Sequence, residues 1–443
     1  MHVIVVGAGA AGLAATYTLR RKGITVTTLE AGHEAGGRAR GVIRDGYIFD
    51  LGAQFAAPFY TTTLRIMTEL GMDEFLPFRF KSALWRNGTL HPISPMSGPE
   101  HRREDLRDLI GFRGLSMKTM LQSAKAVPKI YSRYRKIDFA TWDFSNLVDM
   151  GNQSIADYVL KYGGSDALEY LCQPLTAYLT LGEPEDVSTA HFLSVLGFFL
   201  EGAYALRQGM GSVPRALYNA CMDSIHLSTP VTRIVIEDRT AKGVETESGF
   251  LEADDVICAT TASTALKLMP NLPDTLREPL ETVQYSSTCH LIFGLEQRLL
   301  PEGWYNIVLP RKAGFLSTGP VESASKSPEH APPGAGCVHC LTYGKRAQEM
   351  MDLPDDTLRR LMIEDLQRIV PAFPDEPLIT EIVRWKEAIC LQPPGQFPAI
   401  HGLKTQHYRD VKGLFLAGEY MYLLSSMEGA LRSGIDAAEA VQS

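Results

Sequence analysis

A glycine-rich turn near the start of the chain has the spacing that binds a dinucleotide phosphate. It reads Gly7, Ala8, Gly9, Ala10, Ala11 and Gly12. The first glycine permits a tight turn, the second lets the backbone approach a pyrophosphate, and the third lets a helix pack closely on a strand. An apolar run at 2–6 precedes the turn, and a helical pattern at 13–22 follows it. The sequence therefore predicts a strand, a phosphate-binding turn and a helix N-terminus.

An acidic residue closes the next predicted strand. Gly23 ends the helical pattern, the strand covers 24–29, and Glu30 comes directly after it. A carboxylate at this point accepts hydrogen bonds from both hydroxyls of an adenosine ribose. Because it would repel a 2′-phosphate, the predicted ligand is not of the NADP type. The alternative is a structural turn without function.

Two further turns continue the pattern. Residues 31–38 read Ala-Gly-His-Glu-Ala-Gly-Gly-Arg, which places Arg38 after two adjacent glycines. Arginine suits a charge-assisted contact to a pyrophosphate, although a surface cation would also explain it. Residues 50–54, Asp-Leu-Gly-Ala-Gln, form a turn that can lie against a flat ring.

Residues 7–38 resemble the fingerprint of the flavin amine oxidase superfamily, which spans monoamine oxidases, protoporphyrinogen oxidases and phytoene desaturase-like enzymes. The resemblance implies that FAD is the cofactor, with its ADP half on the glycine-rich turn and its pyrophosphate near the Gly-Gly-Arg element. It also implies that the chain returns to the cofactor later.

Later segments fit that expectation. Residues 208–214 resemble the family's second Gly-Gly-Met segment, and 230–236 read as a strand whose Val231 would hold the adenine through its backbone. A buried strand at 413–417 ends in Gly-Glu, and a helix follows Ser-Met-Glu-Gly-Ala at 426–430. In the family this helix points its N-terminus at the pyrimidine edge of the flavin, where it stabilises negative charge. An ordinary terminal helix is the alternative.

The cofactor-binding residues predicted in this way come from four stretches of the chain. They are Gly7, Gly9, Ala10, Ala11, Gly12, Glu30, Ala31, Gly36, Gly37, Arg38, Gly52, Ala53, Gln54, Val231, Gly418, Glu419, Ser426, Met427 and Ala430. Cys390 lies outside any covalent flavin motif, so the FAD is predicted to be non-covalent.

The predicted fold class is α/β, with a discontinuous Rossmann-like FAD-binding domain and an α+β substrate domain. The FAD-binding domain comprises 1–85, 205–285 and 385–443, and the substrate domain comprises 86–204 and 286–384. Residues 102–136 are rich in cations and apolar residues. They suit either a solvated helical face or contact with a membrane surface.

Composition narrows the class of protein. The chain has 443 residues, which favours two or three domains. A net charge of -8 argues against a nucleic-acid partner. The N-terminus lacks a signal-peptide pattern, and the longest apolar run, 191–206, is too short to span a bilayer. Seven cysteines do not form a disulfide framework. We expect a cytoplasmic protein, with surface membrane association left open and its oligomeric state undetermined.

Catalytic groups are harder to predict because the flavin itself carries the hydride chemistry. The substrate-side candidates are His290, Gln392, Tyr420 and Tyr422, each of which packing would also explain. Amine oxidases of the family place a lysine on the strand corresponding to 287–293, where this chain has none; Cys289 or His290 falls near that position. Cys337 and Cys340 suit a structural thiol pair better than zinc, so no metal is predicted.

The leading prediction for function is two-electron dehydrogenation of a largely apolar substrate, porphyrinogen-like or carotenoid/terpenoid-like. Residues 383–389 resemble the Trp-containing segment of porphyrinogen oxidases, whereas 426–429 resemble amine oxidases and phytoene or squalene-pathway enzymes. Oxidative deamination of an amine or amino acid, and a redox-neutral flavin isomerase or binding protein, are the alternatives. Without a second dinucleotide motif, oxygen or a quinone is the expected electron acceptor.

Overall fold

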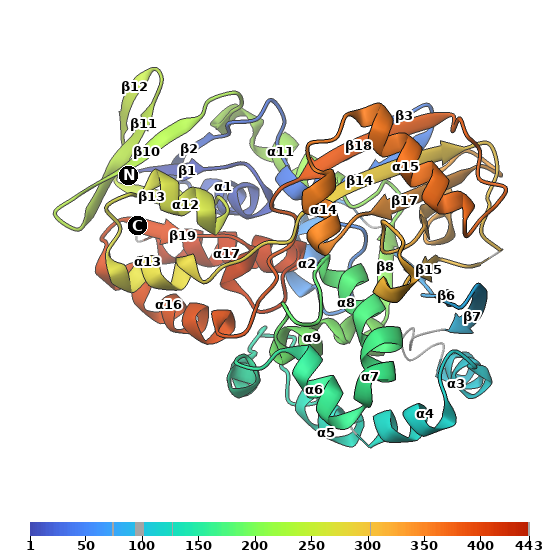
Figure 1. Cartoon of the computed structure of the whole chain (residues 1–443). Coiled ribbons are helices and arrows are strands. Elements are labelled where there is room, and N and C mark those ends of the chain that lie inside the picture. Colours follow the sequence, from blue (N-terminus) through green and yellow to red (C-terminus); the bar gives the residue numbers. More distant parts are fainter. Residues whose placement is uncertain (73–74, 94–101, 126, 302, 442–443) are drawn as a thin grey trace.

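A computed structural model describes residues 1–72, 75–93, 102–125, 127–301 and 303–441. Its first unit is built on a five-stranded parallel sheet in the order β19-β13-β1-β2-β9 (Figure 1). These strands are β1 (His2–Val6), β2 (Thr25–Leu29), β9 (Ile225–His226), β13 (Asp255–Cys258) and β19 (Leu414–Leu416). Parallel strands need buried faces, and β1 is correspondingly almost wholly buried. The α/β prediction is confirmed.

Two helices from opposite ends of the chain cover one face of this sheet. They are α1 (Ala10–Arg21) and α17 (Met427–Ala440). A Cβ on Gly434 of α17 would lie 2.0 Å from the backbone oxygen of Ala11, so the two helices approach at backbone distance. A three-stranded antiparallel sheet lies beside the unit and contains β10 (Val231–Glu237), β11 (Thr240–Thr246) and β12 (Gly249–Glu252).

The second unit contains a seven-stranded mixed sheet in the order β18-β14-β17-β16-β15-β6-β7. Its strands are β6 (Ser82–Arg86), β7 (Thr89–Ile93), β14 (Thr288–Leu295), β15 (Asn306–Val308), β16 (Val321–Glu322), β17 (Gly336–Leu341) and β18 (Ile379–Trp385). Every residue of β14 is buried. The boundary placed at 85/86 falls inside β6, so we propose that the substrate domain begins before residue 82.

A helical part completes the second unit and occupies the lower half of Figure 1. It contains α3 (Arg102–Gly111), α4 (Met117–Ala124), α5 (Val127–Tyr134), α6 (Ile155–Tyr162), α7 (Gly164–Ala167), α8 (Gln173–Thr180), α9 (Thr189–Val195) and α10 (Gly197–Glu201). The apolar run 191–206 is divided between α9, α10 and strand β8 (Ala203–Leu206). Among the described residues, no helix combines the length and the apolar character that crossing a bilayer requires.

The remaining elements are distributed over both units. They are β3 (Gly41–Arg44), β4 (Tyr47–Asp50), β5 (Phe75–Phe78), α2 (Thr61–Glu69), α11 (Ser212–Cys221), α12 (Ala262–Leu268), α13 (Asp274–Glu281), α14 (Gly344–Met350), α15 (Asp355–Gln367) and α16 (Gln396–Asp410). Helices α14 and α15, for example, pack on the seven-stranded sheet. Strand β5 pairs with β8, and β3 pairs with β4. Short 3-10 turns include η1 (Gly37–Ala39), η6 (Arg311–Ala313), η7 (Ser323–Ser325) and η9 (Glu419–Met421).

Candidate cofactor-binding and active site

The glycine-rich turn lies between β1 and α1 and leaves no room for side chains on its inner side. Gly7 has φ +98°, and a Cβ there would lie 3.0 Å from the carbonyl oxygen of Ala259, the residue after the neighbouring strand β13. A Cβ on Gly12 would lie 1.8 Å from the Gly7 oxygen. Gly9, in contrast, has open space around its hypothetical Cβ, and no side chain caps the helix that follows. The free N–H groups of α1 therefore face an open approach, which suits a phosphate.

The carboxylate of Glu30 lies at the end of β2 and organises the neighbouring backbone. It accepts hydrogen bonds from Ala8 N (2.7 Å) and Gly32 N (2.8 Å). A carboxylate has about four acceptor sites, so two remain for a diol. The Glu30 carbonyl accepts from Thr229 N at 2.8 Å, which brings the start of β10 and Val231 to the same end of the sheet.

The Gly-Gly-Arg element contacts the glycine-rich turn directly. Gly36 N donates to Ala8 O at 2.8 Å, and a Cβ on Gly37 would lie 3.2 Å from Gly9 Cα. Arg38 then reaches the C-terminal segment, where it forms a two-pronged ion pair with Glu419 at 2.6 and 2.7 Å. Three segments predicted to share one cofactor are thus brought together.

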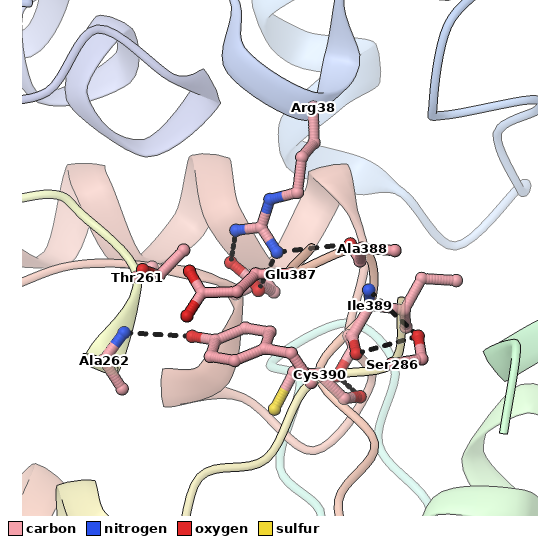
Figure 2. Close-up of polar contacts among 12 residues, drawn as sticks. Arg38, Thr261, Ala262, Ser286, Glu387, Ala388, Ile389 and Cys390 are labelled. Atoms are coloured by element: carbon pink, nitrogen blue, oxygen red, sulfur yellow. Dashed lines mark hydrogen bonds and ion pairs between the residues drawn. The ribbon is translucent and has the colours of Figure 1, made fainter. Parts of the chain in front are cut away.

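Sequence reasoning missed Tyr285, whose aromatic ring packs against the Arg38 side of this ion pair. In Figure 2 it is the ring joined by a dashed line to Ala262. The Tyr285 ring lies 5.5 Å from the Arg38 guanidinium carbon, and its hydroxyl accepts from Ala262 N at 3.0 Å. Arg38 also donates to the Ala388 carbonyl at 3.3 Å. Tyr285 lies in no motif, so only its tertiary position reveals its role.

The turn 50–54 packs against the Gly-Gly-Arg element. Leu51 N donates to Arg40 O at 3.0 Å, and Ala53 N donates to Arg38 O at 3.3 Å. A Cβ on Gly52 would lie 1.9 Å from Arg38 O, so only glycine fits there. The side chain of Gln54 folds back onto its own turn and donates to Asp50 O at 2.9 Å.

His290, on β14, begins a chain of buried hydrogen bonds behind this turn. Its Nδ1 lies 3.1 Å from Leu51 O, and its Nε2 lies 3.0 Å from His339 Nδ1. Burial lowers the pKa of His290 to about 4 and that of His339 well below its usual value, so both rings are neutral. Because Leu51 O can only accept, His290 Nδ1 carries the proton and His339 Nδ1 donates to His290 Nε2.

A buried lysine that sequence reasoning did not predict lies on the other side of the turn. Lys326, which follows η7, has a fully buried side chain and lies 3.1 Å from the Asp50 carboxylate, itself 1% exposed. Its ammonium also bonds the backbone oxygen of Gln54. Strand β14 contains no lysine, and Lys326 belongs to a different segment of the chain.

Helix α17 begins after Ser426, as the sequence predicts. Its first turn also contains the buried carboxylate of Glu428, for which sequence analysis predicted no role. Ser426 caps the helix by accepting from Gly429 N at 3.2 Å, and Met427 and Ala430 lie in the first turn. Glu428 is fully buried and accepts from Thr62 N and Thr63 N at 2.8 and 2.7 Å, so it caps α2 and ties that helix to α17.

The side chains of the other substrate-side candidates are buried in the protein or hydrogen-bonded to other protein groups. Gln392 donates to Tyr422 O at 2.9 Å, while its buried Oε1 has no partner among the described residues. The Tyr422 hydroxyl donates to Asp436 at 2.5 Å, and Tyr420 is fully buried against Gly418. Burial raises the pKa of the Cys390 thiol to about 12, so it is protonated.

Cys337 and Cys340 do not form a thiol pair. They lie on β17 three residues apart and point to opposite faces of the sheet, because side chains alternate along a strand. Cys337 packs in one hydrophobic cluster and Cys340 in another. The prediction of a structural thiol pair is wrong, since it ignored that these residues lie on a strand.

A small apolar cavity opens within the second unit. It is lined by residues of β6, β7, α8, α10 and β15 and by Phe80, which precedes β6; among the others are Leu84, Leu175, Tyr178, Asn306 and Val308. None of the described residues that line it carries a charge. An aromatic cluster connects the cavity to the residue that follows the turn 50–54, because Phe55 contacts Phe80 with ring centroids 5.2 Å apart.

These features fit FAD: open glycines and an uncapped helix suit its pyrophosphate, Glu30 suits its ribose, and the turn 50–54 leads from the pyrophosphate side toward the apolar cavity. Direct contacts join several of the segments predicted to bind FAD: the glycine-rich turn contacts Glu30 and the Gly-Gly-Arg element, and Arg38 contacts both the turn 50–54 and Glu419.

Comparison with known proteins gives the same assignment. The chain is 22% identical to protoporphyrinogen oxidase 2 of Arabidopsis thaliana, over 99% of this chain and 93% of that protein. The structure of a putative protoporphyrinogen oxidase from Exiguobacterium has a TM-score of 0.78 at 20% identity, covering 99% and 98% of the two chains. Cyclohexylamine oxidase from Brevibacterium oxydans has a TM-score of 0.75 at 19% identity, with the same coverage. The family model for flavin containing amine oxidoreductase matches residues 10–442. The chain therefore belongs to the family of flavin-containing amine oxidoreductases and is an FAD-dependent oxidoreductase.

Proposed function

We propose that this enzyme removes two hydrogens from a largely apolar substrate of the porphyrinogen class and passes them to oxygen, which yields hydrogen peroxide. Bound FAD supplies the two-electron acceptor for this reaction. The observation that carries the proposal is the uncharged lining of the cavity, which includes four aromatic rings, one of them Phe80, the contact of Phe55 just after the turn 50–54. The similarity to protoporphyrinogen oxidase 2 over nearly the whole chain supports the same substrate class.

In this proposal the protein binds and orients non-covalent FAD. The glycine-rich turn and Arg38 hold the pyrophosphate, Glu30 the ribose and Val231 the adenine. Residues 50–54 and the N-terminus of α17 lie against the flavin. The ring cluster around Phe55 excludes water between flavin and substrate.

Oxidation of an amine is the second candidate, favoured by the likeness to cyclohexylamine oxidase. Two features argue against it. No carboxylate lines the cavity among the described residues, so a substrate ammonium would lose its hydration without compensation. Strand β14, which we infer corresponds to the lysine-bearing strand of the amine oxidases, has no lysine; Cys289 or His290 falls near that position, and His290 is neutral and bonded at both ring nitrogens.

The test mixes the holoenzyme anaerobically with protoporphyrinogen IX, coproporphyrinogen III, putrescine or L-leucine. We expect a porphyrinogen to bleach the oxidised flavin band, and we expect peroxide without ammonia when air is admitted. Leu175→Trp, which narrows the cavity, should slow bleaching at least tenfold, whereas the exposed Leu378→Trp should not. Bleaching by amines with ammonia release would overturn the proposal in favour of amine oxidation.

We also infer a membrane-facing surface on α3 and α4. Residues 102–136 contain ten Lys or Arg and three Asp or Glu, although the whole chain has a net charge of -8. Large apolar side chains one turn apart are exposed on each helix: Leu106 (57%) and Ile110 (68%) on α3, Met117 (70%) and Leu121 (62%) on α4. Cations beside exposed apolar residues suit an anionic lipid surface, and these helices lie at the outer edge of the helical part in Figure 1.

Co-sedimentation with phosphatidylglycerol vesicles tests this surface. We expect binding that phosphatidylcholine vesicles do not support, and we expect Leu106→Glu with Met117→Glu to abolish it. The matched control, Leu251→Glu with Leu378→Glu, changes exposed leucines elsewhere and should bind like the parent. Equal sedimentation of both double variants would refute a specific face.

A further inference from the structure

The turn 50–54 is held so that one backbone donor has no partner among the described residues. Leu51 O accepts two hydrogen bonds, from Trp385 Nε1 at 2.8 Å and from His290 at 3.1 Å. The Leu51–Gly52 peptide is trans, so the Gly52 N–H points opposite to that carbonyl. No described residue accepts a hydrogen bond from Gly52 N–H.

Lys326 closes the turn from its other side. Its ammonium contacts three oxygens: the Asp50 carboxylate at 3.1 Å, the Gln54 backbone oxygen, and Gln54 Oε1 at 3.4 Å. These oxygens belong to the first and last residues of the turn. An ammonium has three donors on a compact centre, so this one group joins both ends of the turn.

The ion pair is placed where packing alone would favour apolar residues. Both side chains are essentially inaccessible to water, and burying such a pair gives little stability compared with apolar residues of similar volume. Asp50 also accepts from Gly211 N at 3.3 Å, which links the turn to the segment before α11. The Lys326–Asp50 pair is neutral overall and adds no net charge beside the cofactor. Its effect is therefore to fix the conformation of residues 50–54.

We propose that Lys326 is a positioning residue for the flavin, because its ammonium fixes residues 50–54 in the shape that presents the Gly52 N–H to the cofactor. The inference rests on the proposed placement of FAD along this turn and is independent of the identity of the substrate. It assigns to a segment remote in sequence, 323–326, control over how the flavin is bound.

The test uses a charge-balanced double variant, Lys326→Met with Asp50→Asn, which leaves no unpaired buried charge. The readouts are the dissociation constant of FAD from reconstituted apoprotein, the visible spectrum of the bound flavin and its midpoint potential. We expect FAD to bind at least tenfold more weakly, with an altered flavin band and potential. The matched control, Arg368→Met with Asp365→Asn, removes a one-to-one ion pair of the second unit (2.7 Å) that contacts none of residues 50–54, and should leave all three readouts unchanged.

Lys326→Arg tests the inference independently if the double variant does not fold. A planar guanidinium keeps the charge but cannot direct three donors from one atom, so we expect weaker FAD binding and a changed flavin spectrum here too. Parent-like FAD affinity and flavin spectrum in the double variant, or in Lys326→Arg, would overturn the inference. Porphyrinogen turnover by the parent enzyme is scored separately: its absence would refute the proposed substrate and leave the Lys326 result standing.

Discussion

The two units of the molecule place their functional groups by different means. Around the five-stranded sheet, the contacts come from backbone N–H groups and from glycines whose Cβ would collide with backbone, such as Gly12 and Gly52. Around the seven-stranded sheet, they come from buried side chains of distant segments, such as His290, His339 and Lys326. Local backbone geometry requires glycines at fixed intervals, so it can be predicted from the sequence. Side chains that meet from distant segments follow no such interval and cannot be predicted in this way.

The largest effect should come from the glycine-rich turn. Gly12→Val would place a Cβ 1.8 Å from the Gly7 carbonyl oxygen, and we expect a loss of more than about 5 kcal/mol, beyond the usual range of a point mutation. Thermal unfolding and the flavin-to-protein ratio measure it. The control is Gly9→Ala, at φ -71° with open space, which should keep the apoprotein fold and weaken FAD binding only. A stable, flavin-loaded Gly12→Val protein would contradict the backbone account.

The next effect concerns the ion pair between the N- and C-terminal segments. Arg38→Met leaves the Glu419 carboxylate, 10% exposed, without its partner, and should cost about 3–5 kcal/mol in urea unfolding of the apoprotein. The double variant Arg38→Met with Glu419→Gln should cost clearly less, because no uncompensated charge remains. Equal losses in the single and double variants would show that the pair acts through packing instead.

Acid should weaken the second unit through its neutral histidines. Burial lowers the pKa of His191 to about 4, as it does for His290. Since the unfolded chain binds a proton near pH 6.5 and the folded one does not, stability is complete above that pH and falls as pH drops toward 4. Each histidine should contribute a slope of about 1.4 kcal/mol per pH unit, reaching roughly 3 kcal/mol. Urea midpoints between pH 7 and 5 should show a smaller slope in His191→Gln and no change in the exposed His226→Gln.

The smallest effect should come from the ribose contact. Glu30→Gln keeps the shape but loses the charge that accepts from Ala8 N and Gly32 N. We expect FAD affinity to fall by about 1–3 kcal/mol, as for a hydrogen bond to a charged group, measured by titration of the apoprotein. Glu34→Gln, an exposed residue paired with Arg40, is the matched control. Unchanged affinity in Glu30→Gln would move the ribose away from this residue.

Prediction succeeded where elements and motifs are local. The expected helix at 13–22 is α1, the expected strand at 24–29 is β2, and the helix after Ser426 is α17. It failed for Cys337 and Cys340, because spacing alone does not say that a strand separates them onto opposite faces. Tyr285 and Lys326 were missed because neither lies in a local pattern that marks a site.

The sequence by itself determined the cofactor class and the family, because phosphate binding requires glycines, a helix N-terminus and an acid at fixed intervals along the chain. Only the tertiary structure decided which buried groups meet behind the turn 50–54. Lys326 and Asp50 are 276 positions apart, and His290 and Leu51 are 239 positions apart. Such contacts depend on how β4 and the turn after it pack against the seven-stranded sheet, and no interval along the chain encodes that geometry.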